Sequence, residues 1–288
     1  MIQLLVITVC YKSNSALSIL AESLNKQAIR PWKWILIDNA PVSNPVLTPN
    51  TTFPLQIISG NEGDGFGAGC NAALNLVYEM NFDGWVWLLN PDTYLSSSNH
   101  IENLLNTLAN VDPNTILGTA IEDLDNQLEQ SAGWIRKGLG YRKSQITKES
   151  LTQKSRPCIE VDWVSGCNLI FKPSSFSTPL VFDDYFPLYF EDVDFCLRAK
   201  LRGGTCIWLN SLSISHQKST GSECSLFRRE RLKAISQIHF LCRYQPWWVA
   251  IAHTLRIIAL ALQKLPTQFA SSRGTLSGTL QALFNHQY

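Results

Sequence analysis

Short, nearly continuous apolar runs recur along the first 120 residues, and this recurrence limits most strongly what the chain can fold into. Such a run is typical of a strand covered on both faces, as in a parallel sheet. Stretches with a helical apolar stripe lie between several of the runs. This alternation predicts an α/β fold with a parallel, doubly wound sheet. The predicted strands are residues 2–9, 32–38, 55–59, 85–89 and 115–121, and the predicted helices are residues 15–28, 68–80 and 99–110.

The alternation of apolar runs and helical stripes weakens after residue 121 and returns later in the chain. Residues 122–158 carry charges and scattered glycines, which predicts a variable loop or hairpin region. Order returns in residues 161–171, 186–204 and 205–209, followed by a basic helical stretch over 226–243 and an apolar one over 247–262. We therefore expect a main domain over residues 1–243 and a helical extension over residues 244–288.

Composition excludes several classes of protein. The 288-residue chain has a formal net charge of +1, so no overall field recruits nucleic acid. None of its eight cysteines is spaced as C-x-x-C, which disfavours a zinc ribbon or a thioredoxin-type site; buried thiols in a reducing compartment are expected instead. The N-terminal apolar run has neither a basic region nor a cleavage site of small residues, so we interpret it as a core strand and expect a cytoplasmic protein.

Polar side chains gather where the predicted strands end. Ligands of doubly wound sheets bind beyond the carboxyl ends of the strands. The polar residues of interest there are Thr8, Tyr11, Asp38, Asn39, Asn61 and Asp92. Their convergence on one edge of the sheet predicts a ligand site.

Two segments at this edge suggest chemistry. Asp92 follows the fourth predicted strand in LLNPDTYL, where a carboxylate could hold Mg²⁺ or Mn²⁺ against a diphosphate; an ordinary turn aspartate is the alternative. The stretch from Gly60 to Asn71 is rich in glycine, so its backbone could approach a ligand closely, although a flexible loop has the same composition. It lacks G-x-G-x-x-G spacing and no Gly-Lys-Ser/Thr follows, which disfavours a Rossmann dinucleotide site and a Walker A loop.

Three acids lie close together in FPLYFEDVDFCLR. Glu191, Asp192 and Asp194 have aromatic neighbours, and a carboxylate in apolar surroundings takes up a proton more readily, which suits a general base. In a helix, Asp194 would pair with Arg198 four residues later and Asp192 would face elsewhere. The acids could equally mark a helix N-terminus. His216 is a candidate further ligand for the predicted metal, although a single histidine is more often structural.

Together these segments resemble the family 2 glycosyltransferases, in particular the bacterial rhamnosyltransferase-like branch. The resemblance extends from Ile2 to about Arg243. Its carriers are VITVCYKS, IDNA, NEGDGFGAGCN, LLNPDTYL, WVSGCNLIFK and YFEDVDFCLRAKLRGG followed by His216. It implies a GT-A fold, with a mixed Rossmann-like sheet flanked by helices. It also implies inverting transfer of a hexose, such as rhamnose, from a nucleotide-sugar donor to a saccharide or lipid-linked saccharide in cell-surface polysaccharide synthesis.

The resemblance implies roles for individual residues. Asp192 matches the catalytic base, and Asp92 matches the last acid of the metal-binding D-x-D, which here is Asn90-Pro91-Asp92. His216 matches a further contact to the metal or diphosphate, so the expected cofactor is Mn²⁺ or Mg²⁺. The expected donor site comprises Thr8, Tyr11, Asp38, Asn39, Asn61, Asn71 and Asp92, and the expected acceptor site comprises Trp163, Gly166 and Glu191. Ala40 replaces a frequent serine and the glycine stretch is longer than usual, which leaves the individual donor contacts open.

Other functions fit less well. A nucleotidyltransferase would carry a glycine-rich basic loop after the first strand, where this chain has CYKSNSAL. A non-catalytic nucleotide-sugar-binding subunit of a polysaccharide-assembly complex is the main alternative, and the presence of both Asp92 and Asp192 argues against it. A structural subunit of such a complex is a third hypothesis.

The C-terminal apolar stretch suits a membrane surface. His253 and Arg256 interrupt residues 246–265, so the stretch falls short of the ~20 apolar residues that a spanning helix needs. Trp247 and Trp248 at one end favour an amphipathic interfacial helix. Basic residues precede it, namely Arg228, Arg229, Arg231, Lys233 and Arg243. Such a helix would place the protein at the inner face of the cell membrane, near a lipid-linked acceptor; packing on its own domain or in a homodimer is the alternative.

Overall fold

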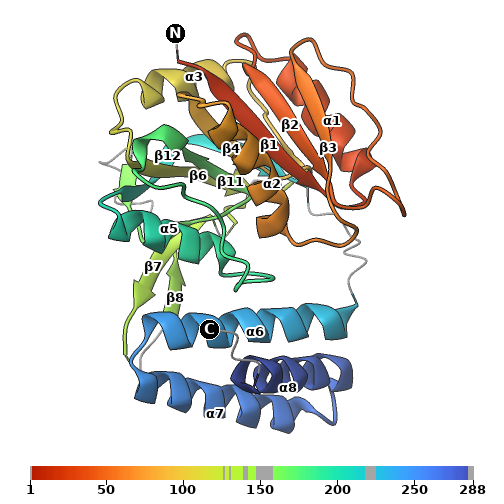
Figure 1. Ribbon diagram of the computed structural model, residues 1–288, viewed down its shortest axis with the longest axis vertical. Helices are drawn as coiled ribbons and strands as arrows, with labels where there is room; N and C mark the ends of the chain where they lie inside the picture. The colour runs from red at the N-terminus through yellow and green to blue at the C-terminus, as the bar shows by residue number, and fades with distance from the viewer. Residues whose placement is uncertain are drawn as a thin grey trace.

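The first half of the chain forms the parallel sheet that its apolar runs predict. In the computed structural model, which describes residues 2–125, 127–129, 131–138, 142–146, 158–217 and 225–284, the first four strands lie in the order β3-β2-β1-β4 and are parallel. They are β1 (Leu4–Cys10), β2 (Lys33–Asp38), β3 (Leu55–Ser59) and β4 (Trp85–Leu89). Helices α1 (Asn14–Asn25), α2 (Phe66–Glu79) and α3 (His100–Leu108) flank the sheet (Figure 1). The side chains of α1 and α3 pack into one apolar cluster and those of α2 into another, so both faces are covered.

The second half of the sheet is antiparallel in part. Strand β6 (Thr115–Glu122) does not lie beside β4, because β11 (Asn168–Phe171) inserts between them and runs antiparallel to both. Strand β12 (Thr205–His216) is parallel to β6 and carries β9 (Cys158–Glu160) and β5 (Thr93–Tyr94) as antiparallel partners. The purely parallel arrangement therefore holds only for the first four strands, whereas the mixed sheet implied by the family resemblance is confirmed.

The weakly patterned region contains a hairpin, as predicted. Strands β7 (Ala132–Arg136) and β8 (Arg142–Gln145) are antiparallel, and β10 (Trp163–Val164) completes a second small sheet in the order β10-β7-β8. The remainder of the predicted region, at 126, 130, 139–141 and 147–157, lies outside the described residues. The 3₁₀ turn η1 (Pro173–Ser175) and helix α5 (Glu191–Leu201) follow.

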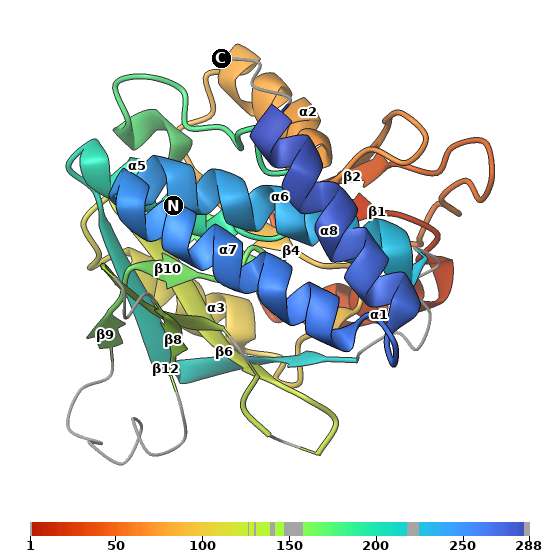
Figure 2. The same cartoon turned by 90° about the horizontal axis from the view of Figure 1, so that it is seen from below.

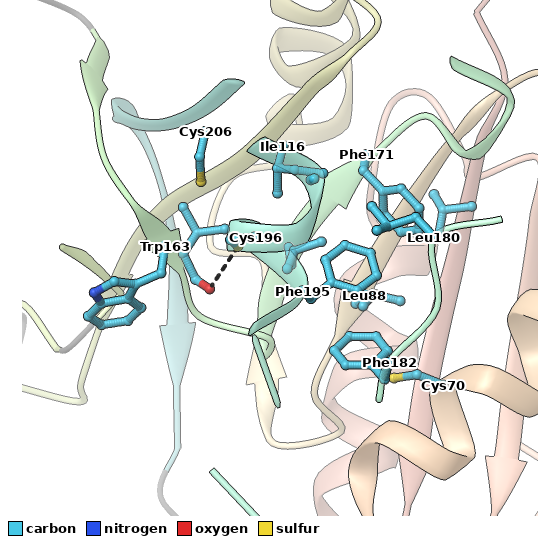
Figure 3. Close-up of a cluster of buried hydrophobic side chains, with 14 of the residues drawn as sticks. Cys70, Leu88, Ile116, Trp163, Phe171, Leu180, Phe182, Phe195, Cys196 and Cys206 are labelled. Carbon is cyan, nitrogen blue, oxygen red and sulfur yellow. Dashed lines mark hydrogen bonds between the residues drawn. The ribbon is translucent and has the colours of Figure 1, made fainter. Parts of the chain in front are cut away.

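Aromatic side chains join α5 to the sheet. Phe195 of α5 stacks on Phe182 with ring centroids 4.6 Å apart and meets the edge of Phe171 at 5.1 Å. Figure 3 shows these rings together, with Cys196 beside them and pointing toward the backbone of Val164. All three rings are buried, so α5 is held rigidly against the sheet.

Three helices form a layer beneath the sheet (Figure 1). They are α6 (Leu226–Tyr244), α7 (Trp247–Lys264) and α8 (Phe269–Phe284). Helix α8 crosses α6 closely (Figure 2), since a Cβ atom on Gly278 would lie 2.1 Å from the Arg231 carbonyl oxygen. The predicted domain boundary at 243/244 falls at the end of α6, whereas the helical layer begins with α6. No helix in the described part of the chain is both long and apolar enough to cross a membrane.

Candidate active site

A short β-ladder brings Asp92 and His216 together. Strand β5 pairs with the end of β12, which places His216 opposite Thr93, and the Gln217 N–H donates to the Asp92 carbonyl oxygen at 2.8 Å. The His216 Nε2 atom lies 3.2 Å from Asp92 Oδ1. Only 15% of the His216 side chain and 18% of the Asp92 side chain are exposed. Asp92 and His216, which the sequence predicted as ligands of one metal ion, are therefore in direct contact.

The second ring nitrogen of His216 contacts Glu129, a residue that sequence reasoning missed. His216 Nδ1 lies 2.9 Å from Glu129 Oε2. Glu129 follows β6 and is fixed by its own N–H, which donates to the Ile121 carbonyl at 2.8 Å. Burial acts to lower the pKa of His216, but the hydrogen bonds and charges of Asp92 and Glu129 outweigh burial, and the pKa is raised. Glu129 lies in the weakly patterned region, where no motif marks it.

The Asp92–His216 pair is suited to a divalent cation. A neutral imidazole has one N–H, which the nearer carboxylate of Glu129 can accept, so the Nε2 lone pair then faces Asp92. Asp92 Oδ1 is buried and, apart from its contact with His216 Nε2, has no hydrogen-bond partner among the described residues. Two ligands that are each about 2.1 Å from a metal and at right angles lie about 3 Å apart, close to the separation found here. Glu129, beyond the imidazole, would orient it as outer carboxylates do.

A cation at this point would have few protein ligands. Within the described ranges, no three His, Cys, Asp or Glu side chains come together as a metal site. Two protein ligands would leave coordination positions for water and for oxygen atoms of a bound diphosphate, an arrangement typical of Mg²⁺.

Asp192 contacts the loop formed by residues 165–167. It lies in the first turn of α5, and its Oδ2 accepts the Gly166 N–H at 3.1 Å. Burial raises the pKa of the neighbouring Cys167 thiol to about 12, and the charges of Asp92, Asp192 and Glu129 all act in the same direction. The charges of all three acids therefore reach one thiol. The loop formed by residues 165–167 therefore adjoins both the candidate base and the segment of Asp92, since the Cys167 carbonyl also accepts the Asn90 N–H at 3.1 Å.

Asp194 is the structural acid of the trio. It is fully buried, and the predicted pair with Arg198 is present, with Nε to Oδ2 at 2.7 Å. Its other oxygen accepts hydrogen bonds from Arg243 at 2.9 Å and from the Tyr244 hydroxyl at 2.6 Å. The sequence indicated neither partner in α6. With Asp194 held in this way, Asp192 is the acid of the trio that contacts the loop, and Glu191 is half-buried beside it in the sequence.

Some of the expected donor residues are accessible. Tyr11 follows β1 and is 39% exposed, so its ring is open to a ligand. Asn61 is exposed and donates to Asp64 Oδ2 at 2.9 Å. Both lie in segments that follow parallel strands, the place where ligands of such sheets bind.

Other expected donor residues hold the structure together. Thr8 is fully buried and accepts the Trp34 indole N–H at 3.0 Å. The Asp38 carboxylate accepts the N–H groups of Ala40 and Val46, at 3.0 and 2.8 Å. The remaining two are amides: buried Asn39 donates to the carbonyls of Asp64 and Gly65, and Asn71 forms a pair of hydrogen bonds with the backbone of Phe182. As placed, these four side chains make hydrogen bonds within the protein that fix its strands and loops.

The glycines before α2 allow close packing. A Cβ atom on Gly60 would lie 2.2 Å from Asn39 Oδ1, and one on Gly69 would lie 2.6 Å from a Val9 methyl. These two glycines are therefore explained by contacts within the protein. Of the expected acceptor residues, Gly166 contacts Asp192 directly and Glu191 opens α5, whereas the Trp163 side chain is buried in the core.

Comparison with known proteins agrees with this architecture. The chain is 26% identical over 281 residues to N-acetylglucosaminyl-diphospho-decaprenol L-rhamnosyltransferase from two strains of Mycobacterium tuberculosis, CDC 1551 / Oshkosh and ATCC 25618 / H37Rv. The match covers 87% of this chain and 88% of the relative. No protein-family model matches the chain.

A solved structure has the same fold. The crystal structure of GalNAc-T7 with UDP, GalNAc and Mn²⁺ superposes with a TM-score of 0.59 at 12% sequence identity. The match covers 95% of this chain but only 54% of GalNAc-T7, so the chain spans about half of that protein. The chain is therefore a glycosyltransferase with the GT-A fold, similar in sequence to a rhamnosyltransferase.

Proposed function

We propose that the chain is an inverting glycosyltransferase that moves a hexose, and specifically L-rhamnose, from a nucleoside diphosphate to a lipid-linked diphosphate saccharide in cell-surface polysaccharide synthesis. The observation that carries the proposal is that the loop 165–167 contacts both parts of the site. The Gly166 N–H donates to Asp192 Oδ2 at 3.1 Å, and the Cys167 carbonyl accepts the N–H of Asn90, two residues before Asp92, at 3.1 Å. The acceptor and sugar are supported by the name of the mycobacterial relatives, which specifies a rhamnosyl transfer to a decaprenol-linked diphospho sugar.

Asp192 acts as the general base. The acceptor hydroxyl attacks the anomeric carbon from the face opposite the leaving nucleoside diphosphate, and Asp192 takes the hydroxyl proton as the new bond forms. A single displacement of this kind inverts the anomeric centre. The N–H groups of Gly166 and Val193 hold one carboxylate oxygen each, at 3.1 and 2.8 Å. Each oxygen has a further lone pair with which to accept the proton.

Asp92 and His216 bind the cation, and Glu129 orients the imidazole. A Mn²⁺ or Mg²⁺ ion held there would supply positive charge to offset the charge that develops on the departing diphosphate. Tyr11 and Asn61, the exposed residues after β1 and β3, contact the donor nucleotide.

Asp192→Asn tests the base directly. The substitution keeps the shape of the side chain and removes its basicity, so sugar transfer should fall by about 10²–10⁴-fold. Binding of the nucleoside diphosphate, measured by calorimetry on the same preparation, should be unchanged because the base acts on the acceptor. Asp184→Asn, at an exposed acid in the same segment, is the matched control. Transfer by Asp192→Asn within a few-fold of the control would exclude Asp192 as the base.

Asp92→Ala tests the cation site. We expect the wild type to bind a nucleoside diphosphate more tightly with Mn²⁺ than with chelator, and the variant to lose this difference. Asp112→Ala, at an exposed turn after α3, is a suitable control. A metal effect of equal size in Asp92→Ala and in the wild type would show that the cation binds elsewhere.

The outward face of α7 attaches the protein to an anionic membrane surface. The buried residues of α7 are Val249, Ala250, Thr254 and Ala261, whereas its exposed apolar residues are Trp247, Trp248, Ile251, Leu255, Leu260 and Leu262. Positions 247, 251, 255 and 262 form a stripe along the helix, with Arg256 and Lys264 also exposed. Apolar residues at helical spacing with flanking cations are typical of interfacial helices. Attachment at the inner membrane face would bring the site to a lipid-linked acceptor.

A further inference from the structure

The backbone that leads into α5 has an uncommon conformation. Tyr189 and Phe190 have φ values of 63° and 66°, so two consecutive bulky residues lie in the left-handed region. Residues other than glycine rarely adopt this conformation, and it persists only where surrounding contacts hold it. The turn ends at Glu191, the first residue of α5, and so sets where Asp192 points.

Helix α6 provides contacts that hold this turn. Phe240 packs on Phe190 with ring centroids 4.9 Å apart. The Ser236 hydroxyl oxygen accepts the Leu188 N–H at 3.3 Å. The His239 ring stacks on Tyr185 at 3.5 Å, in the same segment. The segment before α5 is therefore fastened to α6, which belongs to the C-terminal helical layer.

The end of α6 also holds the first turn of α5. Asp194 is fully buried and receives hydrogen bonds from Arg243 and Tyr244, and Arg243 also bonds Asp183 Oδ2 at 2.7 Å. The Tyr244 hydroxyl is protonated at neutral pH, as an ordinary tyrosine is, and donates to Asp194; burial and the hydrogen bond and charge of Asp194 raise its pKa further. Asp192 lies in this turn and accepts the N–H of Val193, its neighbour in the turn, at 2.8 Å, so its position follows that of the turn; its second donor, the Gly166 N–H, lies in the loop 165–167.

We propose that Arg243 and Tyr244 are positioning residues for catalysis, which through Asp194 hold Asp192 where it can take the acceptor proton. The inference rests on the proposed function, in which Asp192 is the base. It assigns the end of α6 a role in the transfer step itself. A misplacement of about 1 Å of a catalytic group can cost on the order of 10²-fold in rate, so the hydrogen bonds to Asp194 bear directly on turnover.

Tyr244→Phe is the principal test, with Tyr78→Phe as its control. Both changes remove one half-buried hydroxyl from a helix; the Tyr78 hydroxyl donates to the Leu180 carbonyl at 2.9 Å and accepts the Leu180 N–H at 2.8 Å, so its hydrogen bonds are to a residue outside α5. With the nucleoside diphosphate rhamnose that the wild type turns over, Tyr244→Phe should lower kcat by about 10- to 100-fold and leave the KM for the donor unchanged. Tyr78→Phe should stay within about twofold of the wild type. Equal kcat values for the two folded variants would overturn the proposal.

Asp192→Asn separates this proposal from the proposed function. In that background, adding Tyr244→Phe should have no further effect, because residues that act through one another are not additive. A full second loss in the double variant would mean that Tyr244 acts by another route and would refute the positioning role. Near-wild-type transfer by Asp192→Asn alone would instead refute the base, whatever Tyr244 does.

Hydrogen exchange gives a readout that needs no substrate. The Gly166 amide is bonded to Asp192 Oδ2, so its exchange reports whether the carboxylate is in place. We expect faster exchange at Gly166 in Tyr244→Phe and unchanged exchange in Tyr78→Phe. Unchanged exchange in both variants would contradict the proposal.

Discussion

The exposed stripe of α7 can be removed without disturbing the core, and this makes membrane attachment a quantitative prediction. Ile251 and Leu255 are 52% and 61% exposed, so about half of each side chain remains to be buried. Full burial of such a side chain is worth about 1.5–3 kcal/mol, which gives about 1–1.5 kcal/mol for each on insertion into a bilayer interface. The double variant Ile251→Gln/Leu255→Gln should therefore weaken membrane binding by about 2–3 kcal/mol, or about 30- to 150-fold.

Sedimentation with vesicles that contain anionic lipid measures this change. Val42→Gln/Leu47→Gln is the matched control, because these two residues are 84% and 70% exposed in the loop after β2, far along the chain from α7. Point variants are preferable to truncation before Pro246, which would also remove α8 and uncover the face of α6 on which Gly278 packs. If the α7 variant and the control partition alike, the stripe does not contact the membrane. A concentration-dependent dimer that only the α7 variant loses would identify it as a subunit interface.

Two further predictions concern the cation pair and the core. Glu129→Gln keeps a hydrogen-bond acceptor for His216 Nδ1 but removes the negative charge, so Mn²⁺ affinity measured by titration calorimetry should fall by about 10-fold or more. The control Glu79→Gln, at an exposed glutamate of α2, should leave the affinity unchanged. Equal affinities of the two variants would mean that Glu129 does not support the metal site. Phe195→Ala removes a fully buried ring and should lower the free energy of unfolding, measured in denaturant melts, by about 3–5 kcal/mol. Leu201 is 80% exposed in the same helix, so the control Leu201→Ala should change this free energy by less than about 0.5 kcal/mol. Similar losses in the last two variants would contradict the packing described for α5.

The order of strands in the sheet shows where sequence reasoning reaches its limit. Continuous apolar runs predicted β1 to β4 and β6. Strands β1, β2, β4 and β6 are buried on both faces, where such a run is stable, whereas the edge strand β3 is only partly buried. No local pattern indicated that β11 would insert antiparallel between β4 and β6, since pairing depends on contacts between segments far apart in the chain. The resemblance to known glycosyltransferases supplied the mixed sheet that periodicity could not.

The contacts of the candidate site were also predictable only in part. The pairing of Asp194 with Arg198 was predictable because residues four apart share one helix face. The contact of Glu129 with His216 joins residues 87 positions apart, and that of Asp194 with Tyr244 joins residues 50 positions apart. No sequence motif marks Glu129 or Tyr244 as a partner. Asn71 was predicted as a donor contact from its place in a motif, whereas its amide bonds the backbone of Phe182, 111 positions later.

The parallel pairing of β6 with β12 also has a consequence for folding kinetics. Thr115 and Thr205, at the start of this pairing, are 90 residues apart in sequence, so the chain must close a long loop before these contacts form. Long-range parallel pairing is slow to form for this reason. Since β12 carries His216, the chain can complete its first four strands and still have no partner for Asp92. In refolding experiments, the recovery of Mn²⁺ binding should therefore lag behind the burial of Trp34 and Trp87 in the first sheet half.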